Sequence, residues 1–597
     1  MKENTEKKFT VSDVSGKYSL TAGAGTLLID LLADAGLMLP ESPCGRMGIC
    51  KKCGVRIRFE GGWKDVLACQ TRVDSDLQVD CGTLDPANYV CLHESSGRRV
   101  KPAPALKKIL VDSFPDGITL CWEHLCAALE LTTAHGEAGN VGIVRDVAEF
   151  YRTGTVFTAV VRGHKIIGIE SGSTLNEFYG MAFDIGTTTV VGYLINLNDG
   201  GLASTVSSLN PQVAYGADVV TRITLAERDP DGLETLRRLI VACVDDLIGK
   251  ACNGAGLRRE AVYDIVCVGN PCMQHLFLGI QPAGLGRAPY QPVLRGPLSF
   301  DARQAELNVN AAANINWLPG VSGFVGSDTI GMLVAYPLAK AKQKVLALDI
   351  GTNGEMVLAS DGELWACSTA AGPAFEGSCM TCGMRAQTGA IDRVWIEDGT
   401  VFHSVIGGVK ARGLCGSGIV DAVSSLLKEG IIDETGRLEI PEQESGLAGR
   451  FIEKNGMRSF VIAAGAQTED GRDIVISQSD IRELQLAKAA VAAGAKMLIG
   501  EAGLDVKDIQ QVILAGAFGL FLSSESIRTI GLLPDLLCDK ILQVGNAAGL
   551  GAQNALLSDE VLKSAETEAK RIHYLELAGK PKFSDIYMDE LIFRNAV

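Results

Sequence analysis

The chain has 597 residues, of which 47% are hydrophobic and 21% charged, and its formal net charge is −16 at pH 7. This length exceeds a single core and predicts several domains, while the negative charge argues against sequence-independent nucleic-acid binding, which needs a basic surface. Its 17 cysteines, an odd number, and a start (MKENTEKKFT) without an apolar signal core predict reduced thiols and a cytoplasmic protein. No apolar run reaches the roughly 18 residues that span a bilayer, so we expect no membrane segment.

Four cysteines near the N-terminus have a spacing that indicates an iron–sulfur site. Cys44, Cys50 and Cys53 form C-x5-C-x2-C, one residue longer than the plant-type [2Fe–2S] spacing, and Cys69 follows on a later strand. Thiolates gathered in one glycine-bearing loop can enclose a [2Fe–2S] cluster, which predicts electron transfer. A structural zinc site is the alternative, but zinc loops usually use paired C-x2–4-C knuckles, and only one pair here has that spacing.

The first 178 residues predict two small domains and a connection. Strand patterns and one apolar helix candidate over residues 26–36 predict an α+β ferredoxin-like [2Fe–2S] domain over residues 1–94. Residues 95–108, SSGRRVKPAPALKK, contain X-Pro steps that favour extended backbone, so we interpret them as a linker. Residues 109–178 end in the strand patterns FTAVVRG and KIIGIESG and predict a small mixed middle domain.

From residue 179 apolar strand patterns alternate with Asp, Gly and Thr, and one motif occurs twice, as MAFDIGTTTVVGYLI and VLALDIGTNGEMVLA. Each copy predicts two strands joined by a turn whose N–H and hydroxyl groups can meet phosphate, with an Asp that can hold Mg²⁺ through water. A single such turn is most often an ordinary hairpin, whereas the repetition favours a nucleotide site. The predicted phosphate-binding residues are Gly186, Thr187, Thr188, Thr189, Gly351, Thr352, Asn353 and Gly354.

Two further glycine-rich turns support a nucleotide site. RGLCGSGIVD opens a helix candidate whose N-terminus can face an anion, and QVILAGAFGLFL is a strand followed by small residues against which adenosine can lie. Tight helix–strand packing is the alternative for each turn taken alone. The predicted nucleotide-binding residues of these turns are Gly416, Ser417, Gly418, Gly516, Ala517 and Gly519.

These motifs together resemble the superfamily of acetate and sugar kinases, Hsc70 and actin, with Asp184-Ile-Gly-Thr and Asp349-Ile-Gly-Thr as its phosphate motifs and residues 515–519 as its adenosine motif. Joined to the cysteine module, the whole chain resembles the reductive activators of corrinoid proteins, for which VGNPCMQHLFLGI and STAAGPAFEG are typical strings. The resemblance implies a multidomain α/β protein in which residues 179–597 form a duplicated actin-like (ribonuclease H-like) ATPase domain, usually in a homodimer.

The resemblance also implies an activity. A corrinoid methyl-transfer protein that is inactive as Co(II) would be returned to Co(I) at the expense of ATP, with electrons from an external low-potential donor passing through the [2Fe–2S] cluster. Asp184 and Asp349 would organise Mg²⁺ and the attacking water, or Glu355 would orient that water. An ATP-driven electron donor to a radical dehydratase and a non-redox reactivating chaperone for cobalamin enzymes are the alternatives. The first lacks an N-terminal ferredoxin module, and the second needs no cluster.

Several other polar residues have plainer interpretations. Asp218 and Asp328 are further acidic candidates near the cleft, but solvated loop carboxylates are the favoured interpretation. Cys379 and Cys382 form a C-x2-C pair that coincidence explains best in a cysteine-rich chain. His275 is expected to be a packed or hydrogen-bonded histidine rather than a cobalt ligand.

Overall fold

The structure is a computed structural model that describes residues 8–13, 18–34, 53–59, 62–80, 97, 99–112, 122, 125–126, 129, 137–138, 141–377, 380–439, 447–454 and 456–593. Cys44, Cys50 and Cys379 lie outside the described residues. Within these ranges, no helix combines the length and the apolar character that a bilayer crossing requires.

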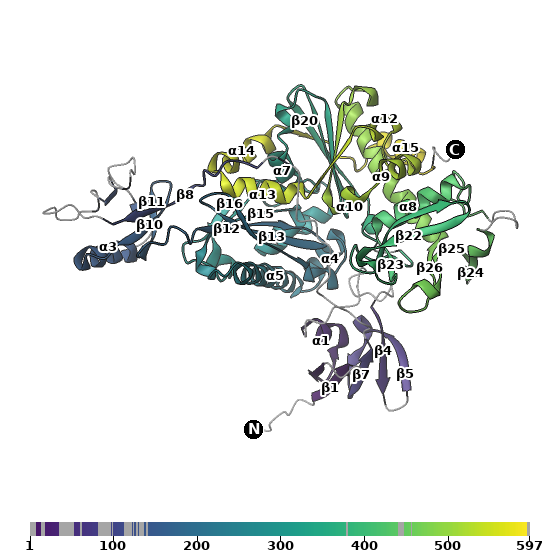
Figure 1. Cartoon of the computed structure of the whole chain (residues 1–597), viewed down its shortest axis with the longest axis horizontal. Coiled ribbons are helices and arrows are strands. Elements are labelled where there is room, and N and C mark those ends of the chain that lie inside the picture. Colours follow the sequence, from purple (N-terminus) through teal and green to yellow (C-terminus); the bar gives the residue numbers. More distant parts are fainter. Residues whose placement is uncertain are drawn as a thin grey trace.

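The described part of the N-terminal module is a five-stranded mixed sheet with helix α1 packed against it and a two-stranded β3-β6 pair (Figure 1). The sheet has the order β2-β1-β7-β4-β5, in which β1 and β7 are parallel and the other pairs antiparallel. The elements are β1 (Lys8–Asp13), β2 (Ser19–Gly23), β3 (Thr26–Leu27), α1 (Leu28–Asp34), β4 (Gly54–Phe59), β5 (Gly62–Leu67), β6 (Arg72–Val73) and β7 (Leu77–Asp80). Alternation in VRIRF buries Val55 and Ile57 on one face, where they join a core with Leu28 and Ile29 of α1.

A separate four-stranded sheet follows, in the order β8-β10-β11-β9, with helix α3 (Val141–Thr153) packed against it. Its strands are β8 (Leu106–Val111), β9 (Glu137–Ala138), β10 (Phe157–Arg162) and β11 (Lys165–Ser171). The two strand patterns predicted at the end of this region correspond to β10 and β11, which pair antiparallel. Lys108 joins this sheet to the next part of the chain, because its buried ammonium group contacts Glu170 at 2.7 Å and lies over the ring of Tyr263.

The described part of the predicted linker is not a free tether. The N–H of Ala103 donates to the carbonyl of Leu557 at 2.7 Å, and the carbonyl of Ala103 accepts from the N–H of Asp559. The N–H of Val100 donates to Asn554 at 3.2 Å. The predicted linker is thus attached to the following part of the chain at Val100 and Ala103, and its last residues, 106–108, belong to β8. The X-Pro steps favour extended backbone, and extended backbone can bond to a neighbouring element.

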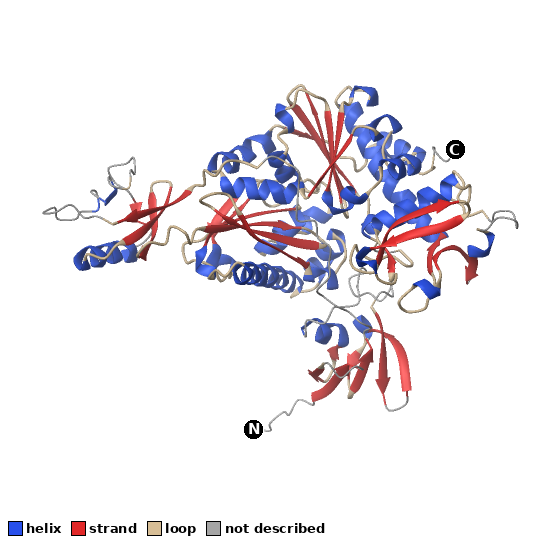
Figure 2. Cartoon of the chain, in the orientation of Figure 1, coloured by secondary structure: helices blue, strands red, loops and turns tan. Residues whose placement is uncertain are grey.

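Two six-stranded sheets of related topology organise the remaining chain (Figure 2). The first has the order β14-β13-β12-β15-β17-β16, and its strands are β12 (Tyr179–Ile185), β13 (Thr189–Asn196), β14 (Leu202–Leu209), β15 (Val262–Gly269), β16 (Leu298–Asp301) and β17 (Asn314–Trp317). The second has the order β28-β27-β18-β19-β20-β29, and its strands are β18 (Val345–Ile350), β19 (Gly354–Ser360), β20 (Glu363–Thr369), β27 (Gln511–Ala515), β28 (Ile541–Gly545) and β29 (Ile572–Tyr574).

The repeated motif occupies the same place in both sheets. An antiparallel hairpin joins β12 to β13 and β18 to β19, and each first strand pairs in parallel with a later one, β15 or β27. The structure thus confirms both predicted hairpins. Two three-stranded sheets are added to the second half, made of β21 (Ala390–Glu397), β22 (Thr400–Val405) and β23 (Gly413–Leu414), and of β24 (Phe451–Lys454), β25 (Met457–Ala463) and β26 (Ile474–Ser477).

Helices cover the two large sheets and separate them. The first half carries α4 (Val219–Arg228), α5 (Gly232–Gly254), α6 (Pro271–Leu278) and α7 (Ser327–Ala335). The second carries α8 (Gly416–Lys428), α9 (Gln478–Glu501), α10 (Gly516–Phe521), α11 (Ser524–Ile530), α12 (Asp535–Cys538), α13 (Ala547–Leu557), α14 (Asp559–Lys570) and α15 (Pro581–Asp589). One apolar cluster includes residues of α7, α13 and both large sheets, so this helix pair lies in the core that the two halves share (Figure 1).

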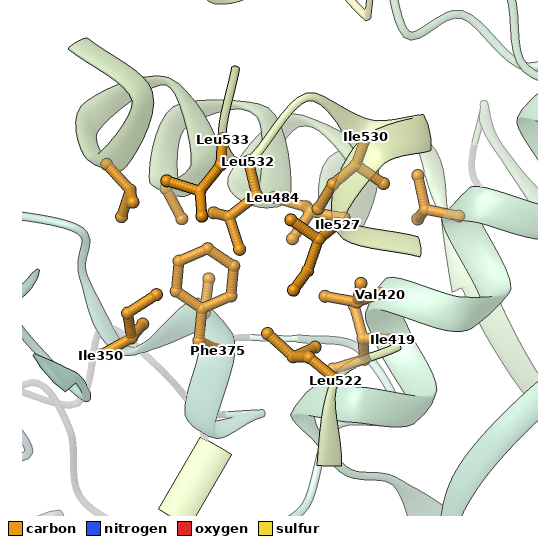
Figure 3. Packing of buried hydrophobic residues seen from close by; sticks show 14 of the residues in the cluster. Ile350, Phe375, Ile419, Val420, Leu484, Leu522, Ile527, Ile530, Leu532 and Leu533 are labelled. Carbon is orange, nitrogen blue, oxygen red and sulfur yellow. The ribbon is translucent and has the colours of Figure 1, made fainter. Parts of the chain in front are cut away.

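A second apolar core fixes the helices of the second half. Phe375, Val420 of α8 and Leu484 of α9 pack with Leu522 and Ile527 (Figure 3). Because these side chains are buried and close-packed, α8 is held rigidly against Phe375 and the neighbouring helices α9 and α11.

Candidate functional site

A cavity of about 280 Å³ lies where the two copies of the repeated motif meet. It brings together predicted residues from both halves of the fold. These are Asp184, Gly186, Thr187, Thr188, Thr189, Asp349, Gly351, Thr352, Asn353, Glu355, Gly416, Ser417 and Gly516. The lining residues that sequence reasoning did not assign to the site include Asn270, Asp328, Phe375, Glu376, Arg385, Phe518 and Asn546.

Some predicted residues lie outside the cavity wall, namely Gly354, Gly418 and Gly519. Two of these glycines allow close packing. A Cβ atom at Gly418 would lie 2.2 Å from the carbonyl oxygen of Ile391, and one at Gly519 would lie 2.8 Å from Cγ of Leu514. At these two positions the alternative interpretation holds: the glycines allow a helix to pack tightly against its neighbours.

Asp184 and Asp349, near the ends of β12 and β18, face the cavity. Removal from bulk water raises the pKa of Asp184 to about 7; a hydrogen bond from Asn546 opposes this shift and the charge of Asp328 adds to it. Burial, followed by the charges of Asp328 and Asp184, raises the pKa of Asp349 to about 7. Each carboxylate therefore favours a nearby positive charge.

Asp328 and Glu355 add two more carboxyl groups to the same cavity. Burial raises the pKa of Asp328 to about 6 even though its carboxylate accepts from the N–H of Thr329. Burial and the charges of Asp328 and Asp349 raise the pKa of Glu355 well above its ordinary value. The solvated-loop interpretation is wrong for Asp328, which begins α7 and lines the cavity, whereas Asp218 caps α4 by accepting from Thr221.

Glu376 connects the two phosphate-type turns. The hydroxyl of Thr188 donates to Oε2 of Glu376 at 2.6 Å, and the hydroxyl of Thr352 donates to Oε1 at 2.7 Å. Because each hydroxyl proton is engaged by the carboxylate, the remaining lone pairs of both threonine oxygens are acceptor sites. Acceptor oxygens suit a cation or its bound water better than they suit phosphate oxygens.

Two asparagines each hold a helix and a site residue at once. Asn270 accepts from the N–H of Met273 at the start of α6 and donates to the hydroxyl of Thr187 at 2.9 Å. Asn546 accepts from the N–H of Gly549 at the start of α13 and donates to Oδ2 of Asp184 at 2.9 Å. A Gly-Asn pair between a strand and a helix precedes both helices, and this N-cap signal could have identified them.

The thiols of Cys53 and Cys69 form a second candidate site, in the N-terminal module. Both are buried, and their Sγ atoms lie 3.1 Å apart. Two thiolates on one tetrahedral metal, with metal–sulfur bonds of about 2.3 Å, would be separated by roughly 3.8 Å, so a small shift would let both bind one ion. Within the described ranges no three potential metal ligands gather. The four-cysteine assignment stays a prediction, because Cys44 and Cys50 lie outside those ranges.

Two related sheets around a cavity, each contributing an Asp and a Gly-Thr turn, define a nucleotide-binding protein of the actin-like class. Residues 343–596 match the family described as the C-terminal domain of RACo, the ASKHA domain, and residues 179–341 match the RACo middle region. The chain belongs to this RACo family, which confirms the resemblance to reductive activators of corrinoid proteins.

Individual relatives agree with this membership. The corrinoid activation enzyme RamQ of Eubacterium limosum is 34% identical over 579 residues, which cover 96% of this chain and 97% of the relative. The [Co(II) methylated amine-specific corrinoid protein] reductase of Methanosarcina barkeri is 26% identical over 455 residues, covering 70% of this chain and 77% of the relative. A solved structure described as a reductive activator for corrinoid,iron-sulfur protein is 31% identical and has a TM-score of 0.76. The match covers 98% of this chain and 98% of that one.

Proposed function

We propose that this protein is an ATP-dependent reductive activator that returns a corrinoid methyl-transfer protein from Co(II) to Co(I). The observation that carries the proposal is the cavity between the two motif copies, in a chain of the RACo family that also carries paired buried thiols. ATP is not a phosphate donor to a substrate in this function, because its binding and hydrolysis drive a change of affinity for the partner.

The carboxyl groups of the cavity suit Mg²⁺-bound nucleotide. Without a cation, the acids of Asp184, Asp328, Asp349 and Glu355 would repel a triphosphate. We therefore propose that Asp184, Asp349 and Asp328 hold Mg²⁺ through water. Glu355 orients the attacking water, and the threonines beside Glu376 face the cation while the N–H groups of the turns meet phosphate.

The other glycine-rich turns would hold the nucleoside. Gly416 and Ser417 begin α8 at the cavity wall, and Gly516, with a φ of +87°, begins α10. A Cβ atom at Gly416 would lie 1.7 Å from the carbonyl oxygen of Phe375, so only glycine fits there. These small residues leave room for adenosine to lie against the backbone.

The paired thiols suit an iron–sulfur centre. We propose that Cys44, Cys50, Cys53 and Cys69 hold a [2Fe–2S] cluster, which supplies one-electron transfer when bound. Burial of Cys53 and Cys69 excludes water from their side of that site. The electron enters from an external low-potential donor and reduces Co(II) to Co(I), with no bond to the protein formed or broken.

The energetics explain why the two sites share one chain. Plant-type [2Fe–2S] donors lie near −400 mV, and moving one electron uphill through about 100 mV costs roughly 2.3 kcal/mol. If the activator binds one cobalt state of the corrinoid protein preferentially, this difference in binding free energy can offset a few such steps of about 100 mV. Release of the corrinoid protein, driven by nucleotide, then makes the cycle directional. We further propose that the protein acts as a cytoplasmic homodimer, as its family resemblance implies.

The proposal is tested with purified protein, a low-potential reductant, Mg-ATP and a corrinoid protein held as Co(II). The Co(I) absorbance should accumulate only when ATP and reductant are both present. Cys69→Ala should stop it by removing the electron path, and Asp349→Ala should stop it by removing ATP turnover. ATP-dependent release of intact cobalamin without reductant would instead support the non-redox chaperone.

A further inference from the structure

The segment that leads from the N-terminal module to the rest of the chain is docked on helices α7 and α13. The N–H of Val100 donates to Asn554 of α13, and Ala103 makes two backbone hydrogen bonds to the junction of α13 and α14. Gly97 packs so closely that a Cβ atom there would lie 2.4 Å from Leu550 of α13 and 3.0 Å from the ring of Tyr336, which ends α7. Three separate contacts therefore fix this segment.

The same two helices reach the nucleotide cavity at their other ends. Asn546, the N-cap of α13, donates to Asp184, and Asp328 stands in the first turn of α7. Helix α13 has 11 residues, so the linker contacts along it begin one turn from its capped end, at Leu550, and reach Leu557, roughly 16 Å away at about 1.5 Å per residue. A single rigid element thus contacts both the cavity and the linker.

Helices α7 and α13 pack backbone to backbone. A Cβ atom at Gly551 would lie 1.8 Å from the carbonyl oxygen of Gly331, and one at Gly331 would lie 2.8 Å from the carbonyl oxygen of Ala548. No side chain is interposed at this contact, so a displacement of either helix must be followed by the other. Both helices belong to the apolar core that the two large sheets share.

We propose that the α7–α13 pair couples the nucleotide cavity to the docking of residues 97 and 99–103, the segment that follows the N-terminal electron-transfer module in the chain. This inference rests on the proposed ATP site. A nucleotide that binds against Asp184 and Asp328 changes the position of the helix starts, and the linker that lies on the same helices gains or loses hydrogen bonds. Coupling between two sites is reciprocal, so the state of the linker must change nucleotide affinity by the same factor.

The direct test is amide hydrogen exchange in the full-length protein, with and without Mg²⁺ and a non-hydrolysable ATP analogue at saturation. The N–H groups of Ala103 and Asp559 report the docking, because each is hydrogen-bonded across the contact. We expect their exchange rates to change at least about fivefold, the lower end of typical couplings. Amides of β24 and β25, which pair with each other in one of the sheets added to the second half, serve as the control. Unchanged exchange at both amides with nucleotide bound overturns the proposal.

A matched pair of variants tests reciprocity. Gly97→Leu places a bulky side chain against Leu550 and should undock the segment, whereas Lys101→Leu changes an exposed position of the same segment. If nucleotide protects the Ala103 amide, Gly97→Leu should weaken nucleotide binding by the same factor, and if nucleotide exposes it, binding should tighten. Lys101→Leu should leave affinity unchanged. Equal affinities in both variants would overturn the proposal.

Failure of this inference differs from failure of the proposed function. A protein that binds ATP and forms Co(I), yet shows no response at Ala103 and Asp559, would refute the coupling alone. A protein that shows the exchange response but never forms Co(I) would refute the proposed activity and leave the coupling established.

Discussion

Replacing Asp349 by asparagine should make the metal-free protein more stable above pH 7. The folded protein raises the pKa of this carboxyl from 3.8 to about 7, chiefly by burial and secondly through the charges of Asp328 and Asp184. Because the pKa of Asp349 is higher in the folded than in the unfolded protein, the protonated carboxyl contributes to the free energy of unfolding. This contribution is fully present below about pH 4 and is lost as pH rises through about 7. Asparagine keeps the shape and removes the charge.

The magnitude follows from the shift. About three pKa units correspond to an upper limit of roughly 4 kcal/mol at about 1.36 kcal/mol per unit. Asp349 retains some contact with the cavity, so solvent screening reduces the gain to about 1–3 kcal/mol. For a domain of this size that gain raises the melting temperature by roughly 2–10 °C.

The assay is thermal unfolding in EDTA at pH 4 and pH 8, with Asp585→Asn, on the exposed surface of α15, as the charge-matched control. Asp349→Asn should melt higher than the parent at pH 8 and close to it at pH 4, while Asp585→Asn changes neither value. Millimolar Mg²⁺ should stabilise the parent at pH 8 and not the variant. Equal melting temperatures of parent and Asp349→Asn at pH 8 would refute the electrostatic reasoning.

Three further changes probe the sites. Cys69→Ser should lose most bound iron and visible absorbance, because the thiol of Cys69 lies 3.1 Å from that of Cys53, whereas Cys243→Ser in α5 should keep both. A full iron content in Cys69→Ser would contradict the ligand assignment. Thr188→Val should lower Mg-ATP turnover at least about tenfold, because it removes an acceptor oxygen at the cation, and Thr188→Ser should keep the parental turnover. Parental turnover in Thr188→Val would argue against a role of this hydroxyl at the cation. Gly516→Ala places a Cβ atom 2.6 Å from Oδ1 of Asp349 and should weaken ATP binding, while Gly503→Ala, also at a positive φ but with open space around it, should not. Equal affinities of the two variants in calorimetry would contradict the proposed role of Gly516 in the nucleotide site.

The phosphate-type turns could be predicted because their signal is local and repeated. Strand, Asp, Gly-Thr turn and second strand follow one another within each copy, and both hairpins form as expected. The start of α8 at Gly416 was likewise visible from the glycine-rich turn before an apolar helix pattern.

Glu376 and Asn546 could not be assigned in this way, because their partners are distant in the sequence. Glu376 binds Thr188 across 188 positions, and Asn546 binds Asp184 across 362. The Gly-Asn pair before α13 indicates an N-cap at Asn546, but only the folded chain shows that Asn546 and Glu376 contact the other half. Asp328 was misjudged for a related reason, since burial at the start of α7 depends on the packing of the other half.

The linker shows the same division between local and distant information. Its prolines correctly predict extended backbone, which is a property of neighbouring residues. Its docking depends on Asn554, which is 454 positions from Val100, and no local pattern indicates such a partner.

In the proposed function, one electron held by this chain reaches cobalt only when ATP is present. A single-turnover experiment tests it directly: protein reduced beforehand and freed of reductant is mixed with a Co(II) corrinoid protein, with or without Mg-ATP, and Co(I) is counted by absorbance. The proposal predicts up to one Co(I) per reduced chain with Mg-ATP and almost none without it. Equal amounts of Co(I) in both samples, or no Co(I) from a fully reduced protein with ATP, would contradict it.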